Sequence, residues 1–137
     1  MNISFIPYAL SVAVSGGDDS AEFYIPVPAD GSPYAVVSAV FLPDTAVTAS
    51  NTNNWTVALK ATDGEAGSPG SSMGGFNTTV ATGASLAVGD KVAISVDASL
   101  AQIVAGGAIQ IDVDEAGTAP AALSGTLMIG IQKRPPA

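Results

Sequence analysis

The residues Ala-Ile-Gln-Ile-Asp-Val-Asp at positions 108–114 decide the fold class, because apolar and polar side chains alternate there with a period of two. In an extended chain the two isoleucines and the valine lie on one face, and the glutamine and the aspartates lie on the other. Such alternation predicts a β-strand that has one face in a core and the other in solvent.

The same pattern recurs on both sides of this stretch. Further strands are predicted at residues 8–15, 23–27, 34–42, 55–61, 76–80, 91–97 and 126–132. Glycine and proline, 15 and 9 residues, are spread along the chain and punctuate these segments with turns. The sequence therefore predicts a single all-β domain over residues 1–137, an antiparallel, jelly-roll-like β-sandwich of seven to eight strands.

Four segments do not follow the alternation. Residues 63–75 hold five glycines and are expected to form a long flexible loop. Residues 98–105 fit a short helix, the one helix expected, with Asp97 as its cap and Gly106 at its end. Residues 1–7 are expected to form an N-terminal arm, and residues 133–137 a C-terminal tail.

The composition excludes several kinds of chemistry. The chain has no cysteine and no histidine, which excludes thiolate sites and a Ser-His-Asp triad and makes zinc or haem sites improbable. None of the common catalytic motifs is present, and the glycine-rich segment lacks the Lys-Ser/Thr of a phosphate-binding loop. We therefore expect no enzymatic activity, no catalytic or cofactor-binding residue, no cofactor and no bound metal.

The charge balance bears on partners. Twelve acidic residues face four basic ones, for a formal net charge of −8, and Lys133-Arg134 is the only adjacent basic pair. Nucleic acids and anionic membranes are disfavoured as partners, because a phosphate-rich surface needs clustered cations. Residues 1–5 carry no positive side chain, and no apolar run approaches ~20 residues, so neither a secretory signal nor a membrane span is expected.

Three groups of polar or aromatic residues are weighed as ligand sites. The carboxylates at 18–19, 63–65 and 112–115 could offer oxygens to Ca²⁺, but acids in turns are more often simply solvated. Trp55 is in phase with Val57 and Leu59, which favours a core position over an exposed sugar platform. Sequons begin at Asn2, Asn54 and Asn77, and chance explains them best.

Two segments are the best candidates for contact with another protein. Residues 34–42 are apolar on both faces, with Val36 and Val40 on one side and Val37 and Phe41 on the other. Such a strand is usually central and covered on both sides. The expected arm, residues 1–7, is also apolar and costly to leave in water. The candidate interface residues are Ile3, Phe5, Ile6, Tyr34, Val37 and Phe41.

A resemblance covers residues 76–132. Leu-Ala-Val-Gly-Asp at 86–90, the strand at 91–97, Gly106-Gly107, the strand at 108–114 and the last strand at 126–132 follow one another in order. This succession resembles the closing half of small β-sandwich proteins of tailed bacteriophages, notably capsid decoration (cement) proteins and head structural proteins. The resemblance implies a virion protein on the capsid surface, made in the host cytoplasm. Its implied partners are the major capsid protein and itself, in a dimer or trimer. The alternative interpretation is a carbohydrate-binding or adhesin-type module.

Overall fold

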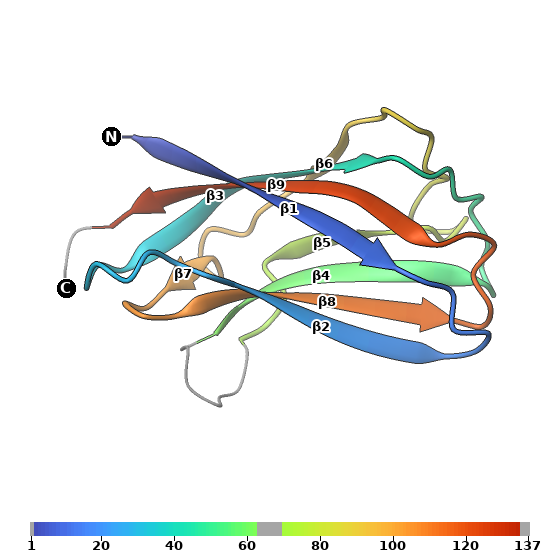
Figure 1. Ribbon diagram of the computed structural model, residues 1–137, viewed down its shortest axis with the longest axis horizontal. Coiled ribbons are helices and arrows are strands. Elements are labelled where there is room, and N and C mark those ends of the chain that lie inside the picture. Colours follow the sequence, from blue (N-terminus) through green and yellow to red (C-terminus); the bar gives the residue numbers. More distant parts are fainter. Residues whose placement is uncertain (1, 63–69, 135–137) are drawn as a thin grey trace.

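The computed structural model describes residues 2–62 and 70–134, and these fold into two packed antiparallel sheets (Figure 1). The strands are β1 (Ile3–Val12), β2 (Asp19–Pro26), β3 (Tyr34–Pro43), β4 (Asn54–Thr62), β5 (Gly74–Asn77), β6 (Val92–Ile94), β7 (Gln102–Ile103), β8 (Ala108–Ala116) and β9 (Leu123–Lys133).

Sheet A has the order β1-β9-β3-β6, with the two-residue β7 also paired to β3, and sheet B has the order β2-β8-β4-β5. With β7 set aside, the eight remaining strands pass between the sheets in the order of a jelly roll. The predicted all-β, jelly-roll-like sandwich is confirmed, with nine strands in the described residues in place of seven or eight.

The core lies between the sheets, because alternate side chains of every long strand point inward. Sheet A contributes Phe41, Leu127 and Ile129, and sheet B contributes Trp55 and Ile111, all 0–1% exposed. The rings of Phe41 and Phe76 stack across the sandwich with centroids 4.9 Å apart. These contacts form one continuous apolar core.

The expected helix at residues 98–105 is wrong. Residues 98–100 form a turn in which Asp97 accepts hydrogen bonds from the backbone N–H and the hydroxyl of Ser99, at 3.0 and 2.7 Å. The chain then enters β7. Ile103 of this strand and Ala101 just before it are buried, and Val104 just after it is half exposed. The buried positions follow a period of two, which strand pairing with β3 satisfies and a helix would not.

The described parts of the expected arm and tail are held in the fold and are not free. Ile3–Pro7 is the first half of β1 and pairs with β9 in an unbroken register that begins at Ile3 and Gln132. Lys133 still belongs to β9, and the Arg134 side chain donates to the carbonyl of Tyr34 at 3.0 Å. Residues 135–137 lie outside the described residues.

The glycine-rich segment is shorter than expected. Its residues 63–69 lie outside the described residues, so its expected flexibility stays a prediction. From Gly70 onward the chain returns to sheet B, where the Met73 N–H donates to the carbonyl of Leu59 at 2.8 Å and the Met73 side chain is buried. Gly74 and Gly75 belong to β5, which pairs with β4. Among the described residues, no helical segment has the length and hydropathy of a membrane span.

Candidate interaction surface

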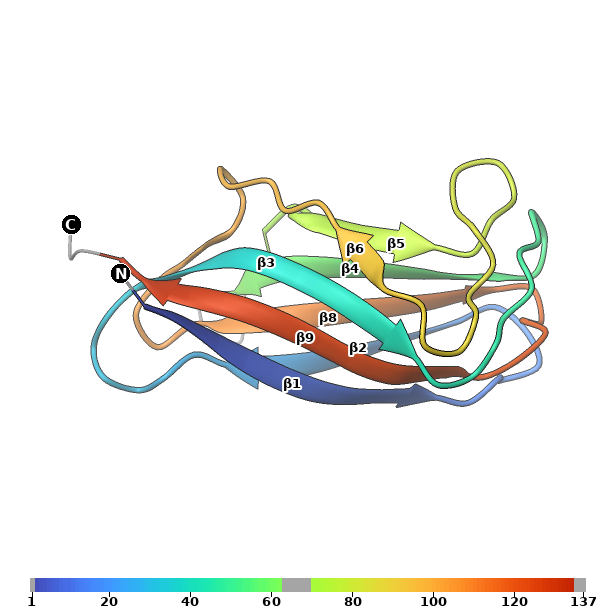
Figure 2. The same ribbon diagram turned by 90° about the horizontal axis from the view of Figure 1, so that it is seen from above.

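The outer face of sheet A is apolar and free of charge. Strand registers place four rows of residues across β1, β9 and β3, and the row of Pro7, Met128 and Val40 continues into β6. Figure 2 looks down on these strands and shows no described element lying over them. The residues of this surface, called the apolar face below, are Ile3, Phe5, Pro7 and Ala9 of β1, Thr126, Met128, Gly130 and Gln132 of β9, Ala35, Ser38, Val40 and Leu42 of β3, and Ala93 of β6.

Phe5 is the most exposed large side chain of the apolar face. It is 62% exposed and lies opposite Gly130 in the β1–β9 register. A Cβ placed at Gly130 would lie 3.2 Å from both the Phe5 ring and the Ile3 side chain. The two side chains therefore pack over the bare backbone of this glycine, and their outer surfaces remain in contact with water.

Charge is almost excluded from sheet A. Lys133 is the only charged residue in its five strands, and it stands at the last position of β9. Its Nζ atom lies 3.0 Å from the Asp30 carboxylate, so even this charge is paired. Asp30 also accepts from the Tyr34 hydroxyl at 2.7 Å and from the Ser32 N–H, and these bonds hold its pKa well below the usual range.

The outer face of sheet B has the opposite character. Lys60 and Asp112 form an ion pair at 2.6 Å, and the Gln110 amide donates to the same carboxylate. Tyr24 is 57% exposed beside them on the edge strand β2. The residues of this polar face are Ser20, Glu22 and Tyr24 of β2, Gln110, Asp112 and Asp114 of β8, and Thr56, Ala58 and Lys60 of β4.

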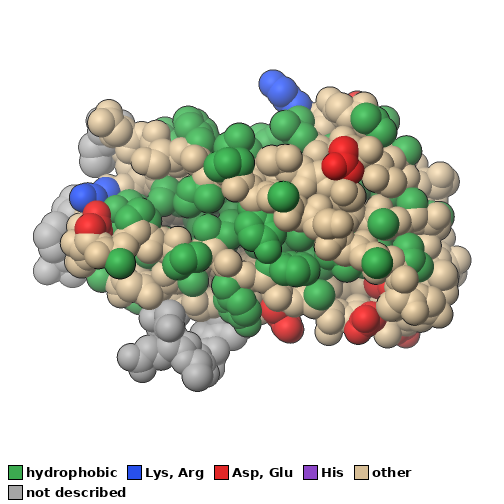
Figure 3. All heavy atoms as spheres, viewed as in Figure 1, with side chains coloured by type: hydrophobic (Ala, Val, Ile, Leu, Met, Phe, Trp, Pro, Cys, Tyr) green, Lys and Arg blue, Asp and Glu red, His purple; other side chains and the backbone are tan. Residues whose placement is uncertain are grey.

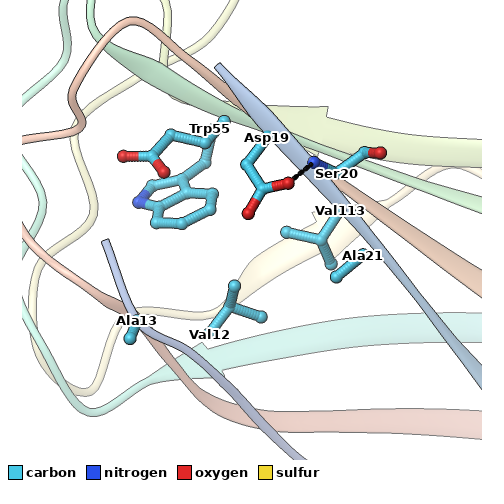
Figure 4. A pocket seen from close by; sticks show the side chains of 8 residues that line it. Val12, Ala13, Asp19, Ser20, Ala21, Trp55 and Val113 are labelled. Carbon is cyan, nitrogen blue, oxygen red and sulfur yellow. Dashed lines mark hydrogen bonds between the residues drawn. The ribbon is translucent and has the colours of Figure 1, made fainter. Parts of the chain in front are cut away.

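The side of the sandwich where β1 and β2 run is apolar as well. Figure 3 shows hydrophobic side chains in a band along the middle of this side, with acidic groups below it and toward one end. Tyr8 of β1 and Phe23 of β2 bridge the two sheets here, with ring centroids 6.2 Å apart. Figure 4 shows a cavity near the end of the band, between Val12, Asp19 and Trp55. Its volume of about 20 Å³ leaves room for roughly one water molecule.

Glu115 lines this cavity and is only 3% exposed. Its Oε1 accepts from the N–H and hydroxyl of Ser15 at 2.9 and 2.7 Å, and its Oε2 accepts from the N–H of Ala119 at 2.9 Å. Burial raises the pKa of this carboxyl, but the three hydrogen bonds outweigh burial and the net pKa is lowered. Glu115 therefore clamps the β1–β2 turn to the β8–β9 turn, which is a structural role.

The structure separates the six candidate interface residues. Ile3, Phe5 and Val37 are exposed, at 46%, 62% and 39%. Tyr34 and Phe41 are buried in the core, at 6% and 0%, and Ile6 packs against the core. Only the first three side chains are available for contact with another molecule.

A β-bulge explains why Val37 is exposed while Phe41, four residues later, is buried. The β3–β9 register shifts between Val36 and Ser38, so that Val37 is an extra residue. After the bulge the inward positions are Ala39 and Phe41, and Val40 points outward opposite Met128. Met128, Gly130 and Leu42, which also belong to the apolar face, were not predicted from the sequence. For the two residues of β9, the sequence feature that could have indicated this face is that every alternate residue of the strand before Lys133 is uncharged.

The other candidate groups divide between surface acids and a buried tryptophan. Asp18 accepts from the Gly117 N–H at 2.6 Å, and within the described residues no three acidic side chains are grouped to hold a metal ion. Asp63 and Glu65 lie outside the described residues. Trp55 is 1% exposed and its indole N–H donates to the carbonyl of Ala121 at 2.8 Å, so the predicted core role is confirmed.

The sequons differ in accessibility. Asn2 is exposed, Asn54 is buried with its amide donating to the carbonyl of Ser50 at 3.1 Å, and the Asn77 side chain accepts three hydrogen bonds from the loop that follows β5. Asn54 and Asn77 therefore have structural roles.

Comparison with known proteins gives little. No protein-family model matches the chain, and no curated protein does. Among solved structures, the chain is similar to one described as "Structure of infectious bursal disease virus Gt strain", with a TM-score of 0.41 and 14% sequence identity. The match covers 93% of this chain and 32% of that one, so the chain spans about a third of its length.

Proposed function

We propose that this chain is a non-enzymatic structural subunit of a virus particle, of the capsid decoration (cement) type. The observation that carries the proposal is the opposition of the two outer faces of the sandwich. The apolar face would contact neighbouring subunits in the particle, and the polar face would remain in water. The proposed partners are the major capsid protein and other copies of the chain, at the capsid surface of particles assembled in the host cytoplasm.

The physical argument starts from the cost of the apolar face. Each large apolar side chain that leaves water contributes about 1.5–3 kcal/mol, and Ile3 and Phe5 of the apolar face are 46% and 62% exposed. A protein that stays alone gains nothing from such a surface, whereas a subunit of an assembly buries it. The net charge of −8 keeps the free subunit soluble until it assembles.

Two further features are compatible with this role. Jelly-roll sandwiches serve in viral capsids as well as in lectins, although a fold alone does not decide a function. The resemblance of residues 76–132 to phage decoration proteins favours the capsid. The sugar-binding alternative is weakened, because the ring considered as its platform, Trp55, is buried.

The test is binding to empty shells assembled from the major capsid protein encoded in the same genome. We expect the purified chain to sediment with the shells and to saturate at a fixed ratio to the capsid protein. Phe5→Glu places a charge on the apolar face and should reduce binding at least tenfold. Tyr24→Glu changes an aromatic side chain of similar exposure on the polar face and should bind like the wild type. A wild-type chain that stays in the supernatant would refute the proposal.

A further inference from the structure

We infer that the apolar face binds a second copy of this chain, face to face across a two-fold axis, so that the subunit is a dimer before it meets a shell. This inference rests on the proposed function in one respect, namely that the apolar face is a contact between subunits. It adds which of the two proposed partners occupies this face, namely another copy of the chain, and the geometry of the contact.

The first argument is the match of charge. A surface without charged groups offers nothing to attract a charged partner, and it desolvates the charges of such a partner without pairing them. It fits an equally uncharged apolar surface. The chain itself carries one, and a two-fold axis brings the same patch of both copies together.

The second argument is the position of the acids. With sheets packed about 10 Å apart, two copies stacked through their apolar faces place their polar faces roughly 30 Å from each other. The Debye length at physiological salt is about 8 Å. The repulsion between the polar faces of the two copies, where Glu22, Asp112 and Asp114 outnumber Lys60, is therefore largely screened. Contact through the polar face would instead bring Glu22, Asp112 and Asp114 of both copies together.

The third argument is area. The three long strands of sheet A have 10, 11 and 10 residues, and β6 adds a short fourth. At about 3.3 Å per residue and about 4.8 Å per strand, such a face measures roughly 540 Å². Two copies would bury about 1,080 Å² in total, which is above the roughly 1,000 Å² that a biological interface needs.

Pro7 distinguishes a face contact from an edge contact. β1 is an edge strand of sheet A and carries no charge to discourage a further strand. Pro7 stands in its middle and has no N–H, so a strand added alongside β1 would meet a gap in the ladder of donors. The structure therefore favours stacking of the two apolar faces over joining of the two β1 edges.

The experiment measures mass in sedimentation equilibrium over a concentration series, with the pure chain and no shell. The wild type is expected to pass from 13.5 kDa to twice that value as concentration rises. Phe5→Glu puts a charge into the apolar contact from both copies and should weaken dimerisation at least about 30-fold, because a buried charge without a partner is costly. Ile3→Glu, on the same strand and face, should weaken it as well, and Tyr24→Glu should change it less than about 3-fold.

Salt gives a second readout. Raising the salt from about 0.05 M to about 0.5 M should strengthen the dimer, since it screens repulsion between acidic copies and leaves apolar contact intact. Circular dichroism and thermal unfolding of each variant at low concentration verify that it is folded. A dimer that weakens with salt, or that Tyr24→Glu disrupts as much as Phe5→Glu, would overturn the inference.

The outcomes separate this inference from the proposed function. A wild-type chain that stays monomeric, while Phe5→Glu abolishes binding to shells, would overturn the dimer and leave the shell role standing. A dimer that Phe5→Glu dissociates, with no binding of the wild type to shells, would confirm the second copy as the partner and refute the shell role.

Discussion

The two sheets share one core but differ on their outer faces. Inward, both present large apolar side chains that are fully buried, such as Leu127 in sheet A and Trp55 in sheet B. Outward, sheet B carries an ion pair and further acids, as a solvated sheet does, whereas sheet A carries mostly small and apolar side chains, with the polar Gln132 and no acid. Core formation accounts for the inner faces. It does not account for the outer face of sheet A, which we therefore attribute to a partner.

The comparison implies that inner positions of the two sheets are equivalent for stability. Trp55→Ala should lower the free energy of unfolding by about 3–5 kcal/mol and Leu127→Ala by about 2–5 kcal/mol, because each leaves a cavity in a closed core. Thr56→Ala, at an exposed position next to Trp55, should change it by less than about 0.5 kcal/mol. Denaturant unfolding measures all three. A decrease of less than about 1 kcal/mol in the free energy of unfolding at either inner position would show that the sheet concerned contributes little to the core.

Acid should lower the stability of the fold through Glu115, which connects the β1–β2 turn to the β8–β9 turn. Its pKa is lowered in the folded state, so its contribution to stability is complete above its ordinary value near 4.5 and is lost as the pH falls toward the folded value. Glu115→Gln keeps the shape but turns an amide donor toward the Ser15 or Ala119 donors, at a cost of about 2 kcal/mol at pH 7.

The measurement is the free energy of unfolding from pH 7 to pH 3, in the wild type and in Glu115→Gln. We expect the difference between the two proteins to shrink as the pH falls below about 4.5. A difference that stays constant over this range would show that the carboxylate charge does not stabilise the clamp.

The fold class could be predicted from the sequence because alternation such as that at 108–114 is a local property that survives in the structure. The first half of β1 could not be predicted from the sequence. Ile3 and Phe5 point outward while Ile6 and Tyr8 pack inward, so both sides of this strand are apolar and no alternation is visible. The apolar character of both sides of β1 removes the alternation that would predict a strand, and it also gives the outer side of β1 its apolar surface.

The apolar face itself could be predicted only in part. Val37 and Phe41 were assigned to one side of a strand, and a bulge at Val37 separated them. The strand at 34–42 was expected to be central and covered on both sides, and β3 is central in sheet A, but no described element covers its outer side. Bulges and the pairing of β1 with β9, more than a hundred residues apart, depend on tertiary structure.

The smallest effect gives the sharpest test of the comparison, because it separates stability from association. Phe5→Ser and Tyr24→Ser each remove one exposed ring from an edge strand, on opposite faces. In the isolated subunit both should cost less than about 1 kcal/mol, since most of each ring is already in water. At high protein concentration, dimerisation stabilises the folded chain by mass action, so the Tm of a protein that dimerises rises with its concentration. The wild type and Tyr24→Ser should therefore show a rising Tm and Phe5→Ser a constant one. A Tm that depends on concentration equally in all three proteins would place the contact elsewhere than on the apolar face.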